Sequence, residues 1–121
     1  MERHYRTVTG TVTANDQGAH LVEWRVGEVP VIWVSRSSEY AEGRAIRGGV
    51  PVCWPWFGPG RGGGLSPAHG FARVAPWRLV AETADDHAVH LVWELTREDI
   101  LDLDGAASFP HAFRAQLEVH V

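Results

Sequence analysis

The chain has 121 residues, of which 45% are hydrophobic, and its 11 arginines against 15 acidic residues give a formal net charge of −4. These totals fit one globular domain or part of one, and the acidic balance argues against a nucleic-acid partner, which would require a basic surface. A single cysteine, Cys53, excludes an internal disulfide framework, and no apolar run approaches the roughly 20 residues of a membrane span.

The first forty residues predict β structure. Threonine and valine alternate at period two over Tyr5–Val12, which predicts a strand, and a turn is expected over Asn15–Gly18. Two further strands are predicted over His20–Val26 and Val29–Val34, joined by a tight hairpin connection at Gly27-Glu28. The apolar face of the first of these two strands, which should be buried, consists of Val22, Trp24 and Val26.

The segment from Arg44 to Trp77 has an unusual composition. It holds four arginines, one histidine, most of the glycines and prolines of the chain, and several large aromatic residues. Proline removes backbone donors and glycine raises the entropy cost of order, so neither a long helix nor a regular strand is expected. An irregular segment of this composition predicts a binding pocket that is carried by the surrounding strands.

Strands resume after this segment. A hairpin is predicted from Trp77–Thr83 and Ala88–Leu95, with a turn at Ala84–Asp86. The acidic stretch Thr96–Gly105 predicts a loop or one helical turn, and Phe113–Val121 predicts a final strand. The buried face of the second hairpin strand should consist of Val89, Leu91 and Trp93. Because no segment shows a sustained period of 3.6 residues, the predicted class is all-β, a sandwich of antiparallel strands.

The alternation of the final strand continues to Val121 without turn residues or a polar tail. A strand of this kind would leave a half-apolar edge unpaired, which native proteins normally cover or charge. We therefore expect residues 1–121 to be the N-terminal portion of a single, longer β-sandwich domain. The alternative is a complete small protein with an abrupt C-terminal strand.

Two arginines are the strongest candidates for ligand binding. Arg47 is followed by two glycines, which let the backbone turn sharply and a ligand come close, and Arg73 lies four residues after His69. In an extended segment, positions 69 and 73 would point to the same side. Since guanidinium groups form forked hydrogen bonds with phosphate or carboxylate, two of them favour an anionic ligand. The alternative is surface ion pairing with Glu39 and Glu42.

The neighbouring side chains offer further contacts. His69 can donate to or accept from a substrate oxygen, although an isolated histidine also serves structural hydrogen bonding. Trp56 and Phe57 adjoin the flexible loop Gly58–Gly64 and could stack on a sugar, or else close the end of the sandwich. Cys53 is expected to be a buried small apolar side chain and not a nucleophile.

Six further histidines raise the question of a metal site. His87 and His90 are three residues apart, a spacing that sends side chains to opposite faces of a strand. We therefore expect no metal site. The first ten residues lack the apolar segment of a secretory signal, so a cytoplasmic protein is expected.

The motifs Ile46–Pro59, IRGGVPVCWPWFGP, and Pro67–Arg73, PAHGFAR, closely resemble those of the hexose-6-phosphate mutarotases. This family, also called the glucose-6-phosphate 1-epimerases, is a branch of the aldose 1-epimerase superfamily. Gly18–Leu21 and Trp24 resemble its early strand, and the likeness spans roughly residues 15 to 121. It implies a β-supersandwich of the galactose-mutarotase type, of which this chain would be the N-terminal part. It also implies an isomerase that interconverts the α and β anomers of a hexose 6-phosphate as a monomer.

The resemblance also implies roles for single residues. Arg47 resembles the arginine that reaches the substrate, Arg73 its partner on the phosphate, and His69 the histidine that hydrogen-bonds the sugar near its reacting end. Ring opening needs one acid and one base and no cofactor. In the family the acid histidine and the base glutamate follow later than Val121. No catalytic residue is therefore expected in this chain, which should be inactive by itself. The alternative function is a non-catalytic module that binds carbohydrate or sugar phosphate.

Overall fold

The computed structural model describes residues 1–121 and contains two antiparallel sheets. The strands of the first sheet lie in the order β1 (Glu2–Arg6), β2 (Gly10–Asn15), β3 (His20–Val26) and β4 (Val29–Ile32). The strands of the second are β5 (Arg78–Ala84), β6 (Val89–Thr96) and β7 (Arg114–His120). Single turns of 3₁₀ helix form η1 (Ala72–Val74), η2 (Glu98–Ile100) and η3 (Ala106–Ser108). The predicted all-β antiparallel class is confirmed.

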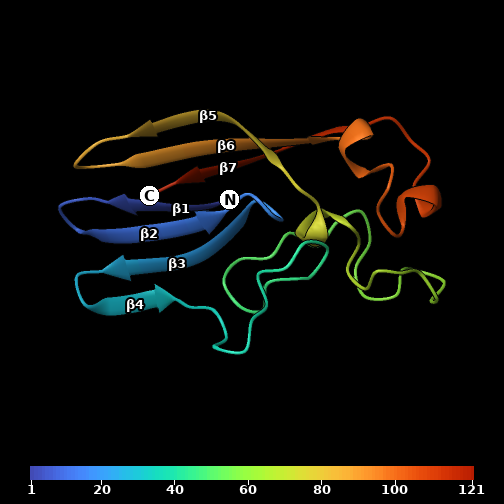
Figure 1. Cartoon of the computed structure of the whole chain (residues 1–121), viewed down its shortest axis with the longest axis horizontal. Coiled ribbons are helices and arrows are strands. Elements are labelled where there is room, and N and C mark those ends of the chain that lie inside the picture. The colour runs from blue at the N-terminus through green and yellow to red at the C-terminus, as the bar shows by residue number, and fades with distance from the viewer.

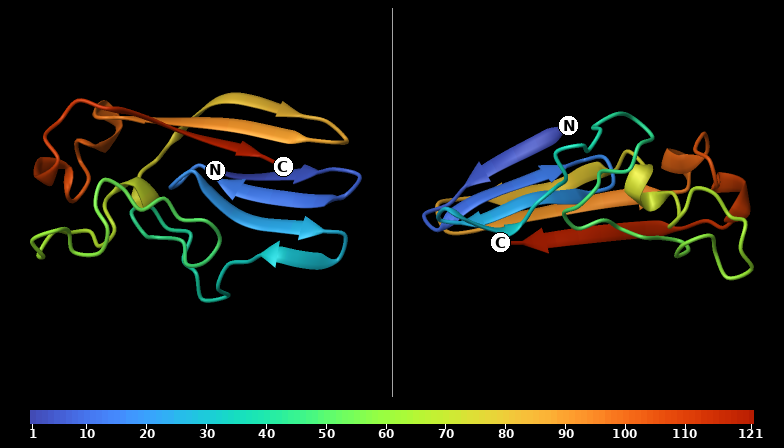
Figure 2. Two further views of the ribbon diagram at one scale, coloured as in Figure 1. Left: turned by 180° about the vertical axis from the view of Figure 1, so that it is seen from behind. Right: turned by 90° about the horizontal axis from the view of Figure 1, so that it is seen from below.

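Both sheets run along the long axis of the molecule. Their hairpin turns lie at one end, and the irregular segments gather at the other end (Figure 1). The views of Figure 2 show the same separation from behind and from below. None of the helical turns is long and apolar enough to cross a lipid bilayer.

The first sheet departs from prediction at its first strand. The chain turns inside the predicted strand Tyr5–Val12, because the amide of Thr7 donates to the carbonyl of Gly10 at 2.9 Å. Tyr5 and Val12 are consequently register partners on neighbouring strands β1 and β2. The prediction was wrong because the β-branched residues of the turn continue the alternation of the strands. Thr and Val favour a pleated backbone, and the one turn signal of the segment, Gly10 at the fourth position of the turn, was not used in the prediction.

The second hairpin of this sheet follows the prediction more closely. Strand β3 has the expected bounds, and Val26 pairs with Val29 across the two-residue connection at Gly27-Glu28. Strand β4 ends at Ile32, and Val34 forms only an isolated bridge. The predicted apolar face of β3 is buried at Val22, whereas Val26 is 45% exposed at the outer end.

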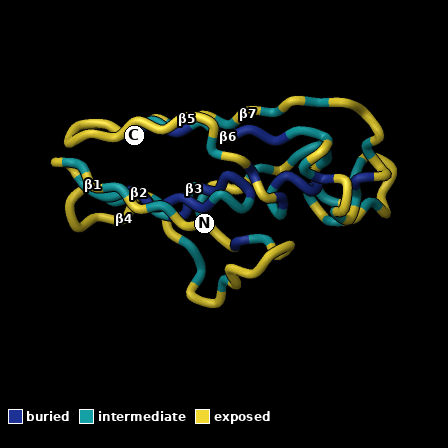
Figure 3. The backbone as a smooth tube through the Cα atoms, turned by 45° about the horizontal axis from the view of Figure 1, so that its top comes forward, coloured by how far each residue is buried: buried dark blue, intermediate teal, exposed yellow.

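The core is centred on the second sheet. The predicted buried face of β6 is confirmed, since Val89, Leu91 and Trp93 are 0–1% exposed. Phe71, from the irregular segment, and Ile100, from η2, are also fully buried and belong to the same apolar cluster. Figure 3 shows buried backbone in the strands and again in the irregular segments, whereas the hairpin ends are exposed. The irregular segments are therefore an integral part of the folded core.

Asp16, in the turn after β2, joins the two sheets. Its carboxylate accepts hydrogen bonds from Arg3 Nε at 2.7 Å and from the indole of Trp93 at 2.8 Å. Its carbonyl accepts the amide of Trp77 at 3.0 Å. Burial alone would raise the pKa of Asp16, but the hydrogen bonds from Arg3 and Trp93 outweigh it and hold the pKa below its usual value.

Candidate functional site

The segment between β4 and η1 contains no strand, as its composition predicts, and hydrogen bonds fix it to the first sheet. Isolated bridges join Leu21 to Val50 and Val34 to Gly48. The carbonyl of Arg47 accepts a hydrogen bond from the amide of Ser35 at 2.8 Å, and the amide of Arg47 donates one to Ser38 Oγ at 2.8 Å. The backbone of Arg47 is therefore held in place while its side chain is exposed.

His20, a fully buried residue of β3, packs against this segment and hydrogen-bonds to it. Its Nε2–H donates to the carbonyl of Gly48 at 2.7 Å, while its Nδ1 is buried without a partner. Burial lowers the pKa of His20, and the bond to Gly48 opposes the shift only in part. A neutral imidazole therefore fixes the carbonyl next to Arg47. Sequence reasoning assigned His20 no role, because the register that brings it under Gly48 is not local.

Gly49 completes the contact. Its φ is +62°, and a Cβ on it would lie 2.3 Å from the carbonyl oxygen of Leu21 and 2.7 Å from His20 Nε2. Only glycine permits this approach of the two segments. The sequence analysis expected the glycine pair after Arg47 to let a ligand come close, and in the structure Gly49 instead lets β3 come close.

His69 is held by a reciprocal pair of bonds with Gly58. Its amide donates to the carbonyl of Gly58 at 2.8 Å, and the amide of Gly58 donates to His69 Nδ1 at 3.0 Å. Because Nδ1 accepts, the proton of the neutral ring is on Nε2, which is left as a donor. His69 also has φ of +68°, a left-handed conformation that is uncommon outside glycine and that gathers at functional sites.

Arg73 lies in η1, and the chain from His69 to Arg73 is not extended. The prediction of an extended segment there was wrong, because a turn and a 3₁₀ helix connect the two residues. The Nη2 of Arg73 donates to the carbonyl of Ala68 at 2.8 Å, and its Nε is buried without a partner. The rest of the guanidinium is not bound to any other group of the chain.

Arg47, His69 and Arg73 line one cavity of about 700 Å³, whose walls come from the two segments described above. Neither arginine has a carboxylate within 4.0 Å, so the ion pairs with Glu39 and Glu42 considered from the sequence are not formed. Glu39 instead lies 3.7 Å from Arg44, and both of these residues also line the cavity. Three guanidinium groups thus face one carboxylate, an excess of positive charge that suits an anion.

The aromatic residues of this segment differ in their surroundings: the two tryptophans pack against the core, whereas Phe57 is exposed. Trp54 and Trp56 pack edge-on against Phe71, and the indole of Trp56 donates to the carbonyl of Pro67 at 3.0 Å. Trp56 is not among the residues that line the cavity, and its contact with substrate stays a prediction. Phe57 is 76% exposed and lies edge-on to His69, with ring centroids 4.6 Å apart. It does not line the cavity either, and its contact with substrate also stays a prediction.

Cys53 was expected to be buried, and this was wrong. The residue is exposed, in an extended stretch between Val52 and Trp54, both of which are partly buried. The alternation of exposure along this stretch turns the thiol to solvent, so apolar neighbours in sequence did not imply burial.

Comparison with known proteins agrees with this picture. The model of one protein family, described as aldose 1-epimerase, matches residues 6–121. Two curated relatives are both named "Putative glucose-6-phosphate 1-epimerase". The Salmonella typhimurium protein is 55% identical over 80 residues, and the Escherichia coli protein is 49% identical over 98 residues. These matches take in 65% and 80% of this chain, but only 27% and 32% of the two relatives.

A solved structure extends the likeness to three dimensions. The crystal structure of a protein described as a "putative mutarotase" from Salmonella typhimurium superposes with a TM-score of 0.81 at 40% identity. The match covers 95% of this chain and 38% of that chain. The chain therefore spans about a third of the length of the relatives that it matches.

Proposed function

The chain belongs to the aldose 1-epimerase family, and on that premise we propose that its cavity binds the phosphate and sugar of a hexose 6-phosphate. The observation that carries the proposal is the presence of Arg47, Arg73 and His69 on one cavity, with both guanidinium groups free of carboxylate partners. A phosphate dianion can accept forked hydrogen bonds from two arginines, and a volume of about 700 Å³ lies within the usual range for ligand sites.

In this proposal each side chain makes a separate contact. Arg47 and Arg73 neutralise the phosphate through guanidinium nitrogens that bind no other group of the chain. His69 donates its Nε2–H to an oxygen of the sugar, because Gly58 keeps the other ring nitrogen occupied. Phe57, which contacts His69 outside the cavity lining, offers an apolar face to the C–H groups of the sugar ring.

We further propose that the whole enzyme interconverts the α and β anomers of this substrate, and that residues 1–121 contribute the binding side of its active site. Ring opening needs a proton donor at the ring oxygen and a base at the anomeric hydroxyl. We also propose a cytoplasmic location, since a charged sugar phosphate does not cross a bilayer unaided, and a monomeric enzyme, as the family resemblance implies.

One observation favours the alternative, a non-catalytic module. The only carboxylate that lines the cavity, Glu39, is paired with Arg44, so the described cavity holds no free base. Such a module would bind glucose 6-phosphate without accelerating exchange between its anomers. Exchange spectroscopy by NMR, which follows the two anomeric protons at equilibrium, distinguishes the two functions.

Calorimetric titration with glucose 6-phosphate, glucose and inorganic phosphate tests the binding site. We expect glucose 6-phosphate to bind best. A hydrogen bond to a charged group contributes about 1.5–3 kcal/mol, so Arg47→Ala and Arg73→Ala should each weaken binding by roughly tenfold to a hundredfold. Arg61→Ala is the matched control, because Arg61 is exposed in the same segment and does not line the cavity. Equal affinity of all three variants and wild type would refute the phosphate site.

A further inference from the structure

A second group of chemically active side chains lies on the outer face of the second sheet, away from the cavity. His90 is near the start of β6, and its register partner on β7 is His120. Glu118 precedes His120 by two residues and so shares its face of the strand. The group lies toward the hairpin end of the sheet, whereas the cavity is built from the irregular segments at the other end (Figure 1).

The three side chains converge on one point. Nε2 of His90 and Nε2 of His120 lie 2.6 Å and 2.8 Å from the same oxygen, Oε1 of Glu118. The two imidazole rings are nearly parallel, with an interplanar angle of 13° and centroids 4.0 Å apart. The ligand atoms of all three residues lie within 4.8 Å of one another.

The backbone beneath the group is regular. β6 and β7 pair over seven successive positions, from His90–His120 to Thr96–Arg114, without a register shift. Antiparallel pairing fixes the distance between opposite Cβ atoms, so the two imidazoles are presented side by side without a loop having to close. A site built on strands holds its geometry better than one built on a loop.

We propose that His90, Glu118 and His120 form a binding site for a divalent transition-metal ion of the Zn²⁺ type. Two imidazole nitrogens and one carboxylate oxygen are a donor set that Zn²⁺ accepts, with water in the fourth position. At metal–ligand distances of about 2.0–2.2 Å, the donors of a tetrahedral site lie about 3.3 Å apart. The two nitrogen–oxygen separations therefore need to widen by less than 1 Å, and the two rings, which are now stacked, must tilt so that both Nε2 atoms point to the ion.

The protons of the site can be accounted for. Each neutral imidazole now donates its Nε2–H to Glu118. When the ion binds at Nε2, the proton that each ring now carries there moves to Nδ1, so a ring that stays neutral binds the metal without net proton release. Glu118 supplies the negative charge that a bound cation requires.

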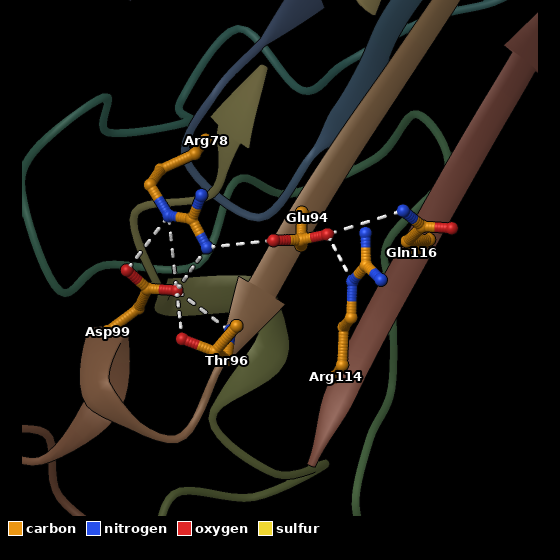
Figure 4. Close-up of polar contacts among 6 residues, drawn as sticks. All are labelled: Arg78, Glu94, Thr96, Asp99, Arg114 and Gln116. Atoms are coloured by element: carbon orange, nitrogen blue, oxygen red, sulfur yellow. Dashed lines mark hydrogen bonds and ion pairs between the residues drawn. The ribbon is translucent and has the colours of Figure 1, made fainter. Parts of the chain in front are cut away.

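A neighbouring carboxylate on the same face shows why the proposal is confined to Glu118. Glu94 of β6 accepts hydrogen bonds from Arg78, Arg114 and Gln116, as Figure 4 shows. Two guanidinium groups already occupy both of its oxygens and would repel a cation. The partners of Glu118 are imidazoles, which are themselves metal ligands.

Titration of the metal-free protein with ZnCl₂ and CoCl₂ tests the site. We expect calorimetry to show one Zn²⁺ bound per chain. Addition of Co²⁺ should give visible d–d absorption as intense as that of tetrahedrally coordinated Co²⁺. His90→Gln, Glu118→Gln and His120→Gln should each weaken Zn²⁺ binding at least about tenfold, because even loss of an outer-shell partner commonly costs 10- to 100-fold.

The matched control is His111→Gln, which removes an exposed histidine outside the group and should leave both titrations unchanged. Arg47→Ala should also leave them unchanged, so that failure of the metal site is distinguishable from failure of the proposed function. Circular dichroism checks that each variant is folded. Absence of stoichiometric Zn²⁺ binding to the wild type, or equal binding by the three ligand variants, would overturn the proposal.

Discussion

Replacement of Gly49 by alanine tests whether the contact between β3 and the chain beside Arg47 determines both stability and binding. A Cβ at this position would lie 2.3 Å from the carbonyl oxygen of Leu21 and 2.7 Å from Nε2 of His20. Since non-bonded atoms approach to about 3.5 Å, the two segments would have to separate by about 1 Å. That separation breaks the 2.9 Å bond from Val50 to Leu21 and the 2.7 Å bond from His20 to Gly48.

The size of the effect follows from these contacts. An alanine at φ of +62° costs about 1–2 kcal/mol, and each of the two hydrogen bonds contributes about 1 kcal/mol, so the free energy of unfolding should fall by about 3–4 kcal/mol. Displacement of Gly48 also moves the neighbouring Arg47. Binding of glucose 6-phosphate should therefore weaken even under conditions in which the variant is fully folded.

Urea unfolding and calorimetric titration at pH 7 measure the two effects. Gly27→Ala is the control, because Gly27 has φ of +55° in the β3–β4 turn, far from the cavity, and a Cβ added there would meet no atom within 4 Å. It should cost only the conformational strain of about 1–2 kcal/mol and leave binding intact. If both variants lose the same stability, or if Gly49→Ala binds glucose 6-phosphate as wild type does, the reasoning is refuted.

Three further predictions concern stability and its dependence on pH. Because burial lowers the pKa of His20, the unfolded chain takes up a proton before the folded protein does as pH falls, and stability should decline below about pH 6.5. Urea midpoints measured from pH 8 to pH 5 should decline less in His20→Gln than in wild type. Asp16→Asn removes the charge that accepts the bonds of Arg3, and urea unfolding at pH 7 should show a loss of about 1.5–3 kcal/mol. The hydrogen bond from Arg114 outweighs burial and lowers the pKa of Glu94, so stability from this charge is present above about pH 4.3 and is lost as pH falls further. Denaturation curves of Glu94→Gln and wild type should accordingly differ at pH 7 and converge near pH 3; parallel curves would contradict this.

Alternation of polar and apolar residues predicted the strands whose apolar side chains are the ones buried in the core. The buried face of β6 and the two-residue turn at Gly27-Glu28 could be recognised from the sequence, because each depends on residues close together in the chain. The turn between β1 and β2 was missed, since Thr7 and Thr9 continue the strand pattern and Gly10 was its single local signal.

Contacts between distant segments determined the features that sequence reasoning missed. Arg47, His69 and Arg73 were predicted from residue type and from family resemblance, and the structure brings them to one cavity. The support from His20 depends on a contact 28 residues away in the chain. The His90–Glu118–His120 group likewise depends on the pairing of β6 with β7, which spacing within one strand could not reveal.

The two walls of the cavity are attached to different sheets. The wall that carries Arg47 is bridged to β3, and the wall that carries Arg73 leads directly into β5. An anion held between them acts as a noncovalent crosslink, and mass action adds about 2.7 kcal/mol of stability at a ligand concentration one hundred times the Kd. The melting temperature of the protein would then report the concentration of the anion that its cavity binds.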